Sequence, residues 1–262
     1  MTGPKVWALV TGAGSGIGAA LAAALVTEGV GVVLVGRRAA HLETVAKPLG
    51  PAALVLPGDI TRPEDRDRIK ATLDTELDRR GAVLRFVVHN AGIGDPSQNF
   101  ASTDPETLAR AFDVNVVAPL ALTQALLPML RQAAPARVLL VGAGIADRPQ
   151  PGTGIYGISK AATARLMRQM AMDFDHEGDA TAPAVALFQP GLVETEGLHA
   201  HVAAASACGL PHAAWLAGRL ENGDAQTPET TATLMSTAML RLPVAEFHGR
   251  QLQHHDLSPL LG

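Results

Sequence analysis

One stretch near the N-terminus decides the fold of this chain: Val6-Trp-Ala-Leu-Val-Thr-Gly-Ala-Gly-Ser-Gly-Ile-Gly18. Its first five residues form an apolar run that predicts a buried strand, and the alanine-rich residues 19–28 predict a helix. Between them, four glycines at alternating positions predict a tight turn, because glycine allows close approach of the backbone to a ligand or to another segment. The chain therefore begins as strand, tight turn and helix.

This turn has the context of a dinucleotide-binding site. A glycine-rich turn between a strand and a helix presents backbone amides to an anion at the helix N-terminus. We expect a pyrophosphate to be bound by Gly12, Ser15, Gly16, Ile17 and Gly18. The alternative is a glycine-rich turn that binds no ligand.

Strands and helices continue to alternate along the chain. Apolar runs predict strands over 30–35, 53–56, 84–89, 137–141 and 185–189, and the helices between them include 39–47 and 156–174. This alternation is typical of an α/β fold, a Rossmann-type doubly wound parallel sheet flanked by helices. We expect one domain over 1–262, in which the segment at about 192–224 has no strand signal and forms a substrate-side lid.

Three helix starts carry capping signals. Thr61 with Glu64, and Thr103 with Glu106, match a capping box, in which a hydroxyl and a carboxylate satisfy free amides. Thr227 is expected to cap the last helix, with a proline at its first position.

Composition narrows the classes of function. The 21 basic and 25 acidic residues give a net charge of −4, so no nucleic-acid partner is expected. The single cysteine, Cys208, fits a reducing compartment, and we expect a cytoplasmic protein. Glycines interrupt the N-terminal apolar run, so we expect no membrane segment. His254 and His255 lack the spacing of metal ligands, so we expect no metal.

Two arginines follow the second predicted strand, where many dinucleotide folds place an acid that binds the ribose hydroxyls. Arg37 and Arg38 could pair with a 2′-phosphate, which favours NADP(H) over NAD(H). The alternative is that both arginines begin a solvated helix.

Tyr156 and Lys160 lie four residues apart in a predicted helix, so both side chains leave the same face. A phenol has an ordinary pKa of about 10, and a nearby ammonium lowers it, which suits acid–base catalysis. Taken alone, the pair could equally be a tyrosine packed on a lysine stem.

Together these landmarks resemble the short-chain dehydrogenase/reductase family across essentially the whole chain. The resemblance rests on the glycine turn from Thr11, on Asn90-Ala91-Gly92, on Asn115, on Tyr156-x-x-x-Lys160 and on Pro190-Gly191-x-Val193-x-Thr195. The family implies a sheet of about seven strands, a homodimer or homotetramer, and hydride transfer from a nicotinamide cofactor.

The resemblance also implies roles for individual residues. Tyr156 would be the general acid in reduction, Lys160 would hold the nicotinamide ribose and tune the phenol, and Asn115 would anchor a water in the proton relay. The other implied cofactor contacts are Asp59 and Ile60 at the adenine, and Asn90, Ala91 and Gly92 beside the adenosine ribose. Val193 and Thr195 would contact the nicotinamide, and Pro190 and Gly191 belong to the same cofactor-binding motif.

The chain departs from the family at one position. The family places a serine about thirteen residues before the tyrosine, and this chain has Ala143 there. One explanation is that Asp147, Gln150 or Thr153 replaces the serine hydroxyl in a carbonyl reductase. A second is that the substrate is an imine, whose iminium form needs no donor at oxygen and could be stabilised by Asp147. The third is an NADP(H)-binding sensor or partner protein with little turnover.

Overall fold

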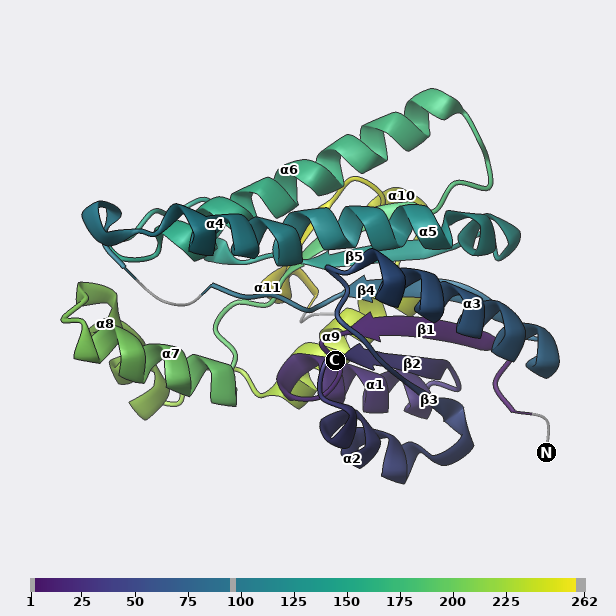
Figure 1. The fold of residues 1–262 in the computed structure, drawn as a ribbon, viewed down its shortest axis with the longest axis horizontal. Helices are drawn as coiled ribbons and strands as arrows, with labels where there is room; N and C mark the ends of the chain where they lie inside the picture. The colour runs from purple at the N-terminus through teal and green to yellow at the C-terminus, as the bar shows by residue number, and fades with distance from the viewer. Residues whose placement is uncertain (1–2, 95–97, 258–262) are drawn as a thin grey trace.

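Seven parallel strands form one sheet in the computed structural model, which describes residues 3–94 and 98–257 (Figure 1). Their order is β3-β2-β1-β4-β5-β6-β7, and every neighbouring pair runs parallel. The strands are β1 (Val6–Thr11), β2 (Gly31–Gly36), β3 (Ala53–Pro57), β4 (Val83–His89), β5 (Arg137–Val141), β6 (Ala184–Gln189) and β7 (Gln251–Gln253). The predicted doubly wound α/β fold is confirmed.

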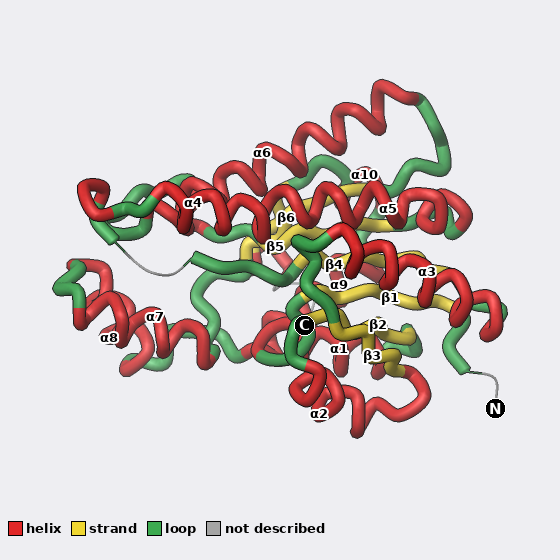
Figure 2. Tube along the Cα trace, in the orientation of Figure 1, coloured by secondary structure: helices red, strands yellow, loops and turns green. Residues whose placement is uncertain are grey.

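Helices cover both faces of this sheet (Figures 1 and 2). One face packs against α1 (Gly16–Thr27), α2 (Ala39–Leu49) and α9 (Pro228–Arg241), and the other against α3 (Pro63–Arg80), α5 (Ala118–Gln132) and α6 (Gly154–Glu177). Strand β1 serves both cores, since Ala8 and Val10 join the first and Trp7 and Leu9 the second. A strand buried on both faces explains the continuous apolar run in the sequence.

The expected lid over 192–224 consists largely of two helices that extend away from the sheet (Figure 1). They are α7 (Glu196–Ala207) and α8 (Pro211–Glu221), which pack against each other. The shorter elements are η1 (Gly50–Ala52), η2 (Phe100–Ser102), α4 (Pro105–Phe112), the π-helical turn η3 (Asp113–Val117), η4 (Gly144–Ala146), α10 (Val244–Phe247) and α11 (His254–Leu257).

Both predicted capping boxes are wrong. Helix α3 is preceded by Arg62, which makes no side-chain cap, and the hydroxyl of Thr61 donates to Asp59. Helix α4 is capped by Asp104, whose carboxylate accepts from two backbone amides. At α4, the aspartate next to Thr103 has taken the threonine's expected role, because a carboxylate accepts hydrogen bonds more strongly than a hydroxyl. The cap predicted at Thr227 is confirmed, since Thr227 accepts from the Thr230 amide, but its helix α9 is not the last, because α10 and α11 follow it.

The helical stretch 105–132 is long and apolar enough to cross a membrane, judged by length and composition alone. Core helices of water-soluble proteins pass the same test. In this stretch Leu122, Leu126 and Leu130 are fully buried in the core formed with the sheet. This packing is that of a core helix, and the stretch is weak evidence for a membrane span.

Candidate active site

A cleft of about 390 Å³ lies where the strand order reverses. Strand β1 has β2 on one side and β4 on the other, and the chain leaves β1 and β4 at the same edge of the sheet. Parallel sheets bind ligands at such a point. The predicted residues that line the cleft are Gly12, Ser15, Gly16, Ile17, Arg37, Arg38, Asp59, Ile60, Asn90, Ala91, Gly92 and Thr195.

The turn after β1 requires its glycines. Gly12 and Gly16 have φ angles of +66° and +53°, in the left-handed region that favours glycine. A Cβ on Gly18 would lie 2.4 Å from the carbonyl oxygen of Gly12 and 2.6 Å from Nδ2 of Asn90. Gly18 therefore packs beneath the cleft rather than lining it.

Asn90 fixes this turn to the end of β4. Its Nδ2 donates to the carbonyl oxygens of Thr11 and Gly12 at 3.1 and 3.2 Å. In return, the Thr11 hydroxyl accepts from the backbone amides of Asn90 and Ala91, both at 3.1 Å. Nδ2 of Asn90 thus holds the turn that shapes the cleft, and Asn90 also lines the cleft.

The N-terminus of α1 fits a pyrophosphate. Its N-cap, Ser15, makes no side-chain cap, and no acidic residue lies in the first turn. The first amides of the helix therefore keep their hydrogen-bonding capacity and face no nearby negative charge from that turn. Thr195 lies opposite, since its Cγ2 would be 3.3 Å from a Cβ on Gly16.

Arg37, Arg38 and His41 form a basic rim at the β2 side of the cleft. The two arginines are exposed, and neither guanidinium makes an ion pair or hydrogen bond with the described part of the chain. These free charges fit a phosphate. His41 was not predicted, although its place in the first turn of the helix that follows the two arginines could have put it on the same rim.

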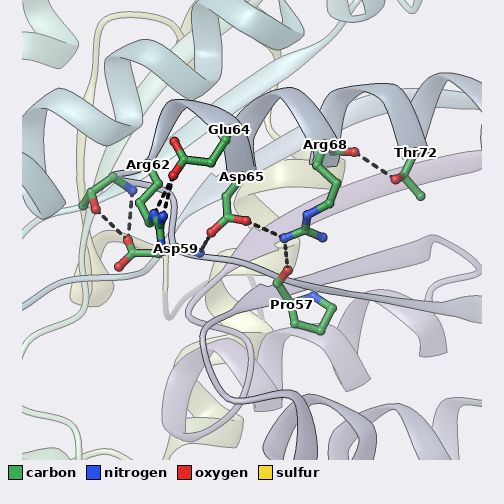
Figure 3. A network of polar contacts seen from close by, with 8 residues as sticks. Pro57, Asp59, Arg62, Glu64, Asp65, Arg68 and Thr72 are labelled. Atoms are coloured by element: carbon green, nitrogen blue, oxygen red, sulfur yellow. Dashed lines mark hydrogen bonds and ion pairs between the residues drawn. The ribbon is translucent and has the colours of Figure 1, made fainter.

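The loop after β3 is a hydrogen-bonded network (Figure 3). Arg68 donates to the Pro57 carbonyl and to Asp65, and Asp65 accepts from the backbone amide of Asp59 at 2.8 Å. Arg68 and this amide hold the pKa of Asp65 below its usual value. The Asp59 carboxylate in turn accepts from the amide and hydroxyl of Thr61. The predicted adenine contacts therefore stand on a fixed loop.

Lys160 is buried in α6, with 4% of its surface exposed. Its Nζ donates to the carbonyl oxygen of Val141 at 2.8 Å and lies 5.6 Å from the centre of the Tyr156 ring. Burial lowers the pKa of Lys160 to about 8. The predicted pair is therefore brought together on one helix face.

Gly92 connects this pair to the cleft. A Cβ on Gly92 would lie 3.2 Å from Nζ of Lys160 and 3.3 Å from Oδ1 of Asn115. A Cβ on Gly94 would lie 2.4 Å from the Tyr156 ring. Small residues after β4 thus allow Tyr156 and Lys160 to lie close behind the wall of the cleft, which they do not themselves line.

Asn115 lies in the π-helical turn between α4 and α5, a distortion often found at functional sites. Its side chain exchanges hydrogen bonds with the backbone of Ile93 and donates to the hydroxyl of Ser159 at 2.8 Å. Its backbone carbonyl accepts from the Thr163 hydroxyl. The amide side chain of Asn115 is therefore committed to Ile93 and Ser159.

The residues considered as replacements for a serine follow β5. Ala143 is half-buried, and Asp147 and Gln150 are exposed. The Thr153 hydroxyl donates to the Gln150 carbonyl at 2.8 Å. Asp147 lies 3.5 Å from Nε2 of Gln189, at the limit of a hydrogen bond. Thr153 is thus the candidate whose donor is already used.

The segment after β6, residues 190–195, is held in place by contacts with Gln226. Gln226 contacts it through its side chain, which donates to the Pro190 carbonyl, and through its backbone, which pairs with residues on either side of Val193. Gly191 has a φ of +73°. Thr195 caps α7, a role that was not predicted. Pro190, Gly191 and Val193 lie outside the lining of the cleft.

No group of three or more His, Cys, Asp or Glu side chains within residues 3–94 and 98–257 is arranged to hold a metal ion. The site described above is therefore built from glycines, amides, two free arginines and a tyrosine–lysine pair.

Comparisons with known proteins match this geometry. The family model described as short chain dehydrogenase matches residues 6–205. An oxidoreductase of Sarocladium schorii, asL5, is 32% identical over 171 residues, which are 65% of this chain and 67% of that protein.

Two solved structures have the same fold over nearly their full length. The KRED1-Pglu enzyme is 27% identical, with a TM-score of 0.83 over 94% of this chain and 99% of its own. A 3-ketoacyl-(acyl-carrier-protein) reductase from Brucella melitensis, solved with NADH, is 25% identical, with a TM-score of 0.77 over 97% of each chain.

Proposed function

Because this chain belongs to the short chain dehydrogenase family and is therefore an oxidoreductase that uses a nicotinamide cofactor, we propose that it is an NADPH-dependent reductase of small organic substrates. NADPH, when bound, supplies a hydride from C4 of its nicotinamide to a C=O or C=N bond. The observation that carries the proposal is the cleft that combines a pyrophosphate cradle with two free arginines and whose wall at Gly92 adjoins the buried Lys160, the partner of Tyr156.

Tyr156 donates the proton that the reduced substrate needs. Lys160 supports it because its buried ammonium lies near the phenol and favours negative charge there as the proton leaves. The Val141 carbonyl holds this ammonium in place. A water on the backbone carbonyl of Asn115 would return the proton from solvent, and Asn115 also ties the loop at Ile93 to α6.

The choice of NADPH rests on the rim of the cleft. A 2′-phosphate would meet the free guanidinium groups of Arg37 and Arg38, with His41 beside them. The Brucella reductase was solved with NADH, so the fold alone does not distinguish NADPH from NADH. In this chain we assign that distinction to the basic rim.

Arg37→Ala is expected to weaken NADPH binding selectively. A charge-assisted hydrogen bond to phosphate contributes about 1.5–3 kcal/mol, so the Kd for NADPH should rise roughly tenfold to a hundredfold. The Kd for NADH should change by less than about threefold. Titration of both cofactors into wild type and variant measures this, and equal weakening of both would contradict the selection. Arg62→Ala is the control, because Arg62 is exposed and pairs with Glu64 outside the cleft.

A second candidate reaction, imine reduction, is favoured by the residues after β5. Ala143 offers no hydroxyl to a substrate oxygen, and the Thr153 hydroxyl is committed to the Gln150 carbonyl. The Asp147 carboxylate is exposed and could lie near an iminium cation. An iminium carries its own positive charge and needs no such donor.

Ala143→Ser separates the two reactions. NADPH oxidation is followed with paired ketones and cyclic imines. In a carbonyl reductase, the restored donor should raise ketone turnover by roughly tenfold or more, since loss of such a donor costs about 10²–10³ in rate. Imine turnover that stays equal or falls, with ketones inactive, would favour imine reduction.

Tyr156→Phe is the control for catalysis in this panel. It should abolish turnover in an enzyme and leave cofactor affinity nearly unchanged. If neither wild type nor Ala143→Ser oxidises NADPH with any substrate, and both bind NADPH tightly, a cofactor sensor would be favoured instead.

A further inference from the structure

The C-terminal end of β7 lies beside the segment Pro190–Gly191. In the parallel pairing of β6 with β7, Gln189 lies opposite Gln253. The next residues along the two strands, Pro190 and His254, therefore leave the sheet side by side. His254 begins the short helix α11, which packs against β7 and α9.

The imidazole of His254 lies directly against Gly191. A Cβ on Gly191 would be 2.6 Å from Cε1 and 2.8 Å from Nδ1 of this ring, closer than real Cβ atoms approach other atoms. The ring therefore occupies the side of Gly191 where any other residue would carry its side chain. Gly191 is itself exposed, so its backbone has His254 on one side and solvent on another.

A hydrogen bond joins His254 to the backbone carbonyl of Gln189. Burial, the largest effect, and the neighbouring His255 lower the pKa of His254, while this carbonyl and Asp256 act in the opposite direction. The neutral ring is thus favoured at pH 7, where it can both pack against Gly191 and donate to Gln189.

From this juxtaposition we propose that His254 is a positioning residue for the nicotinamide half of the cofactor site. Its ring packs under Gly191 and holds the last carbonyl of β6, and so fixes the backbone of the segment 190–195 from below. It contacts the segment rather than the cofactor. Sequence alone offered His254 only as an unsupported metal ligand, and the fold gives it a different use.

The inference rests on the cofactor of the proposed function, so its test uses NADPH as a direct probe. The Kd is measured from the change in nucleotide fluorescence on binding, and the melting temperature of the cofactor-free protein is recorded for each variant. Wild type that binds neither NADPH nor NADH would refute the proposed function itself. With wild-type binding established, the variants test His254 alone.

His254→Ala should raise the Kd for NADPH about tenfold, because a misplaced backbone segment loses well-oriented contacts. The KM for NADPH should rise with it, while kcat at saturation falls less. His254→Gln keeps a donor for the Gln189 carbonyl and should recover affinity to within about threefold of wild type. If His254→Ala fails to fold, His254→Gln and His254→Phe are compared with each other, and the donor-bearing variant should bind more tightly.

His255→Ala is the matched control. His255 is the adjacent residue of the same type, but its side chain is 66% exposed and faces Asp256. The Kd of the His255→Ala variant for NADPH should stay within about twofold of the wild-type value. A similar loss in both variants, or a His254→Ala Kd within twofold of wild type, would overturn the proposal.

A double-mutant cycle tests the contact itself. Gly191→Ala introduces a Cβ that meets the His254 ring and also strains a positive φ. In the His254→Ala background the clash with the ring is removed, and the strain of the positive φ remains. Gly191→Ala should therefore weaken NADPH binding several-fold less in that background than in wild type, and additive losses would show that the two residues do not act through each other.

Discussion

Lys160→Met is expected to lower turnover strongly and, at the same time, to make the cofactor-free protein more stable at pH 7. The ammonium is buried, and it forms no ion pair with a carboxylate among residues 3–94 and 98–257. Burial lowers the pKa from 10.5 to about 8, which corresponds to roughly 3 kcal/mol of unfavourable desolvation in the charged form. Methionine has a similar shape and carries no charge.

The net gain in stability should be smaller than this cost. The variant loses the hydrogen bond to the Val141 carbonyl, which contributes about 1–2 kcal/mol. We therefore expect the free energy of unfolding to rise by about 1–2 kcal/mol at pH 7. Turnover should fall by roughly 10²–10⁴, because the phenol loses the charge that supports proton transfer.

The stability gain should depend on pH. The pKa of Lys160 is lower in the folded state, so the penalty is fully present below about pH 8. Between pH 8 and 10.5 the unfolded chain binds more protons at this position, and the wild type gains stability relative to the variant as pH rises. Above that range Lys160 is neutral in both the folded and the unfolded protein. The methionine variant should then have no electrostatic advantage in stability over wild type.

Urea unfolding of the two proteins at pH 7, 9 and 10.5 measures this difference. Lys47→Met is the matched control, because Lys47 is exposed at the end of α2 and its replacement should change stability by less than about 0.5 kcal/mol. A Lys160→Met protein that is less stable than wild type at pH 7 would show that the fold stabilises the ammonium more than burial destabilises it.

The sheet could be predicted because each of its first six strands is an apolar run. Strand β5 has the predicted bounds, 137–141, and the others differ at one or both ends by a residue. Strand β7 has three residues, of which Leu252 is buried and both neighbours are glutamines, so it carries no apolar run. Its pairing depends on β6, which lies more than sixty residues earlier in the chain.

The candidate site also has parts that the sequence predicts and parts that only the fold shows. The glycine turn and the Tyr156–Lys160 pair are local patterns, and local patterns can be seen in a sequence. The contacts of His254 with Gly191 and of Asn90 with Gly12 join segments far apart in the chain. The placing of Asn90 beside a ribose stays a prediction, and the structure adds that its Nδ2 holds the turn. Such uses follow from the topology of the sheet, which places the ends of parallel strands together.

Arg137 shows the same kind of long-range contact, and its replacement by leucine is expected to destabilise the fold strongly. Arg137 begins β5 and is 8% exposed. Its guanidinium donates to the carbonyl oxygens of Ala238, Met239 and Leu242, at the C-terminal end of α9. It also lies 5.0 Å from the centre of the Phe247 ring. A cation here satisfies carbonyls that have no partner within the helix and opposes their negative dipole.

Leucine would relieve the desolvation of the charge, which lowers the pKa of Arg137, but it would leave three buried carbonyls without their donor. Each hydrogen bond to a charged group contributes about 1.5–3 kcal/mol, so a net loss of roughly 3–5 kcal/mol is expected. This is a large part of the usual 5–15 kcal/mol of a folded domain. Arg137→Lys, with fewer donors and no planar fork, should recover part of the loss.

Urea unfolding measures the loss of stability. Arg241→Leu is the control, because Arg241 lies on α9, the helix whose carbonyls Arg137 binds. Arg241 pairs with Glu28 on the surface, where its side chain is 61% exposed, so its loss should cost less than about 1 kcal/mol. Arg137 lies at the end of β5 opposite the cleft, so the folded fraction of the variant should keep its Kd for NADPH. If Arg137→Leu were no more destabilising than Arg241→Leu, the carbonyls at the end of α9 would have to find other donors, and the buried cation would contribute nothing that leucine packing does not replace.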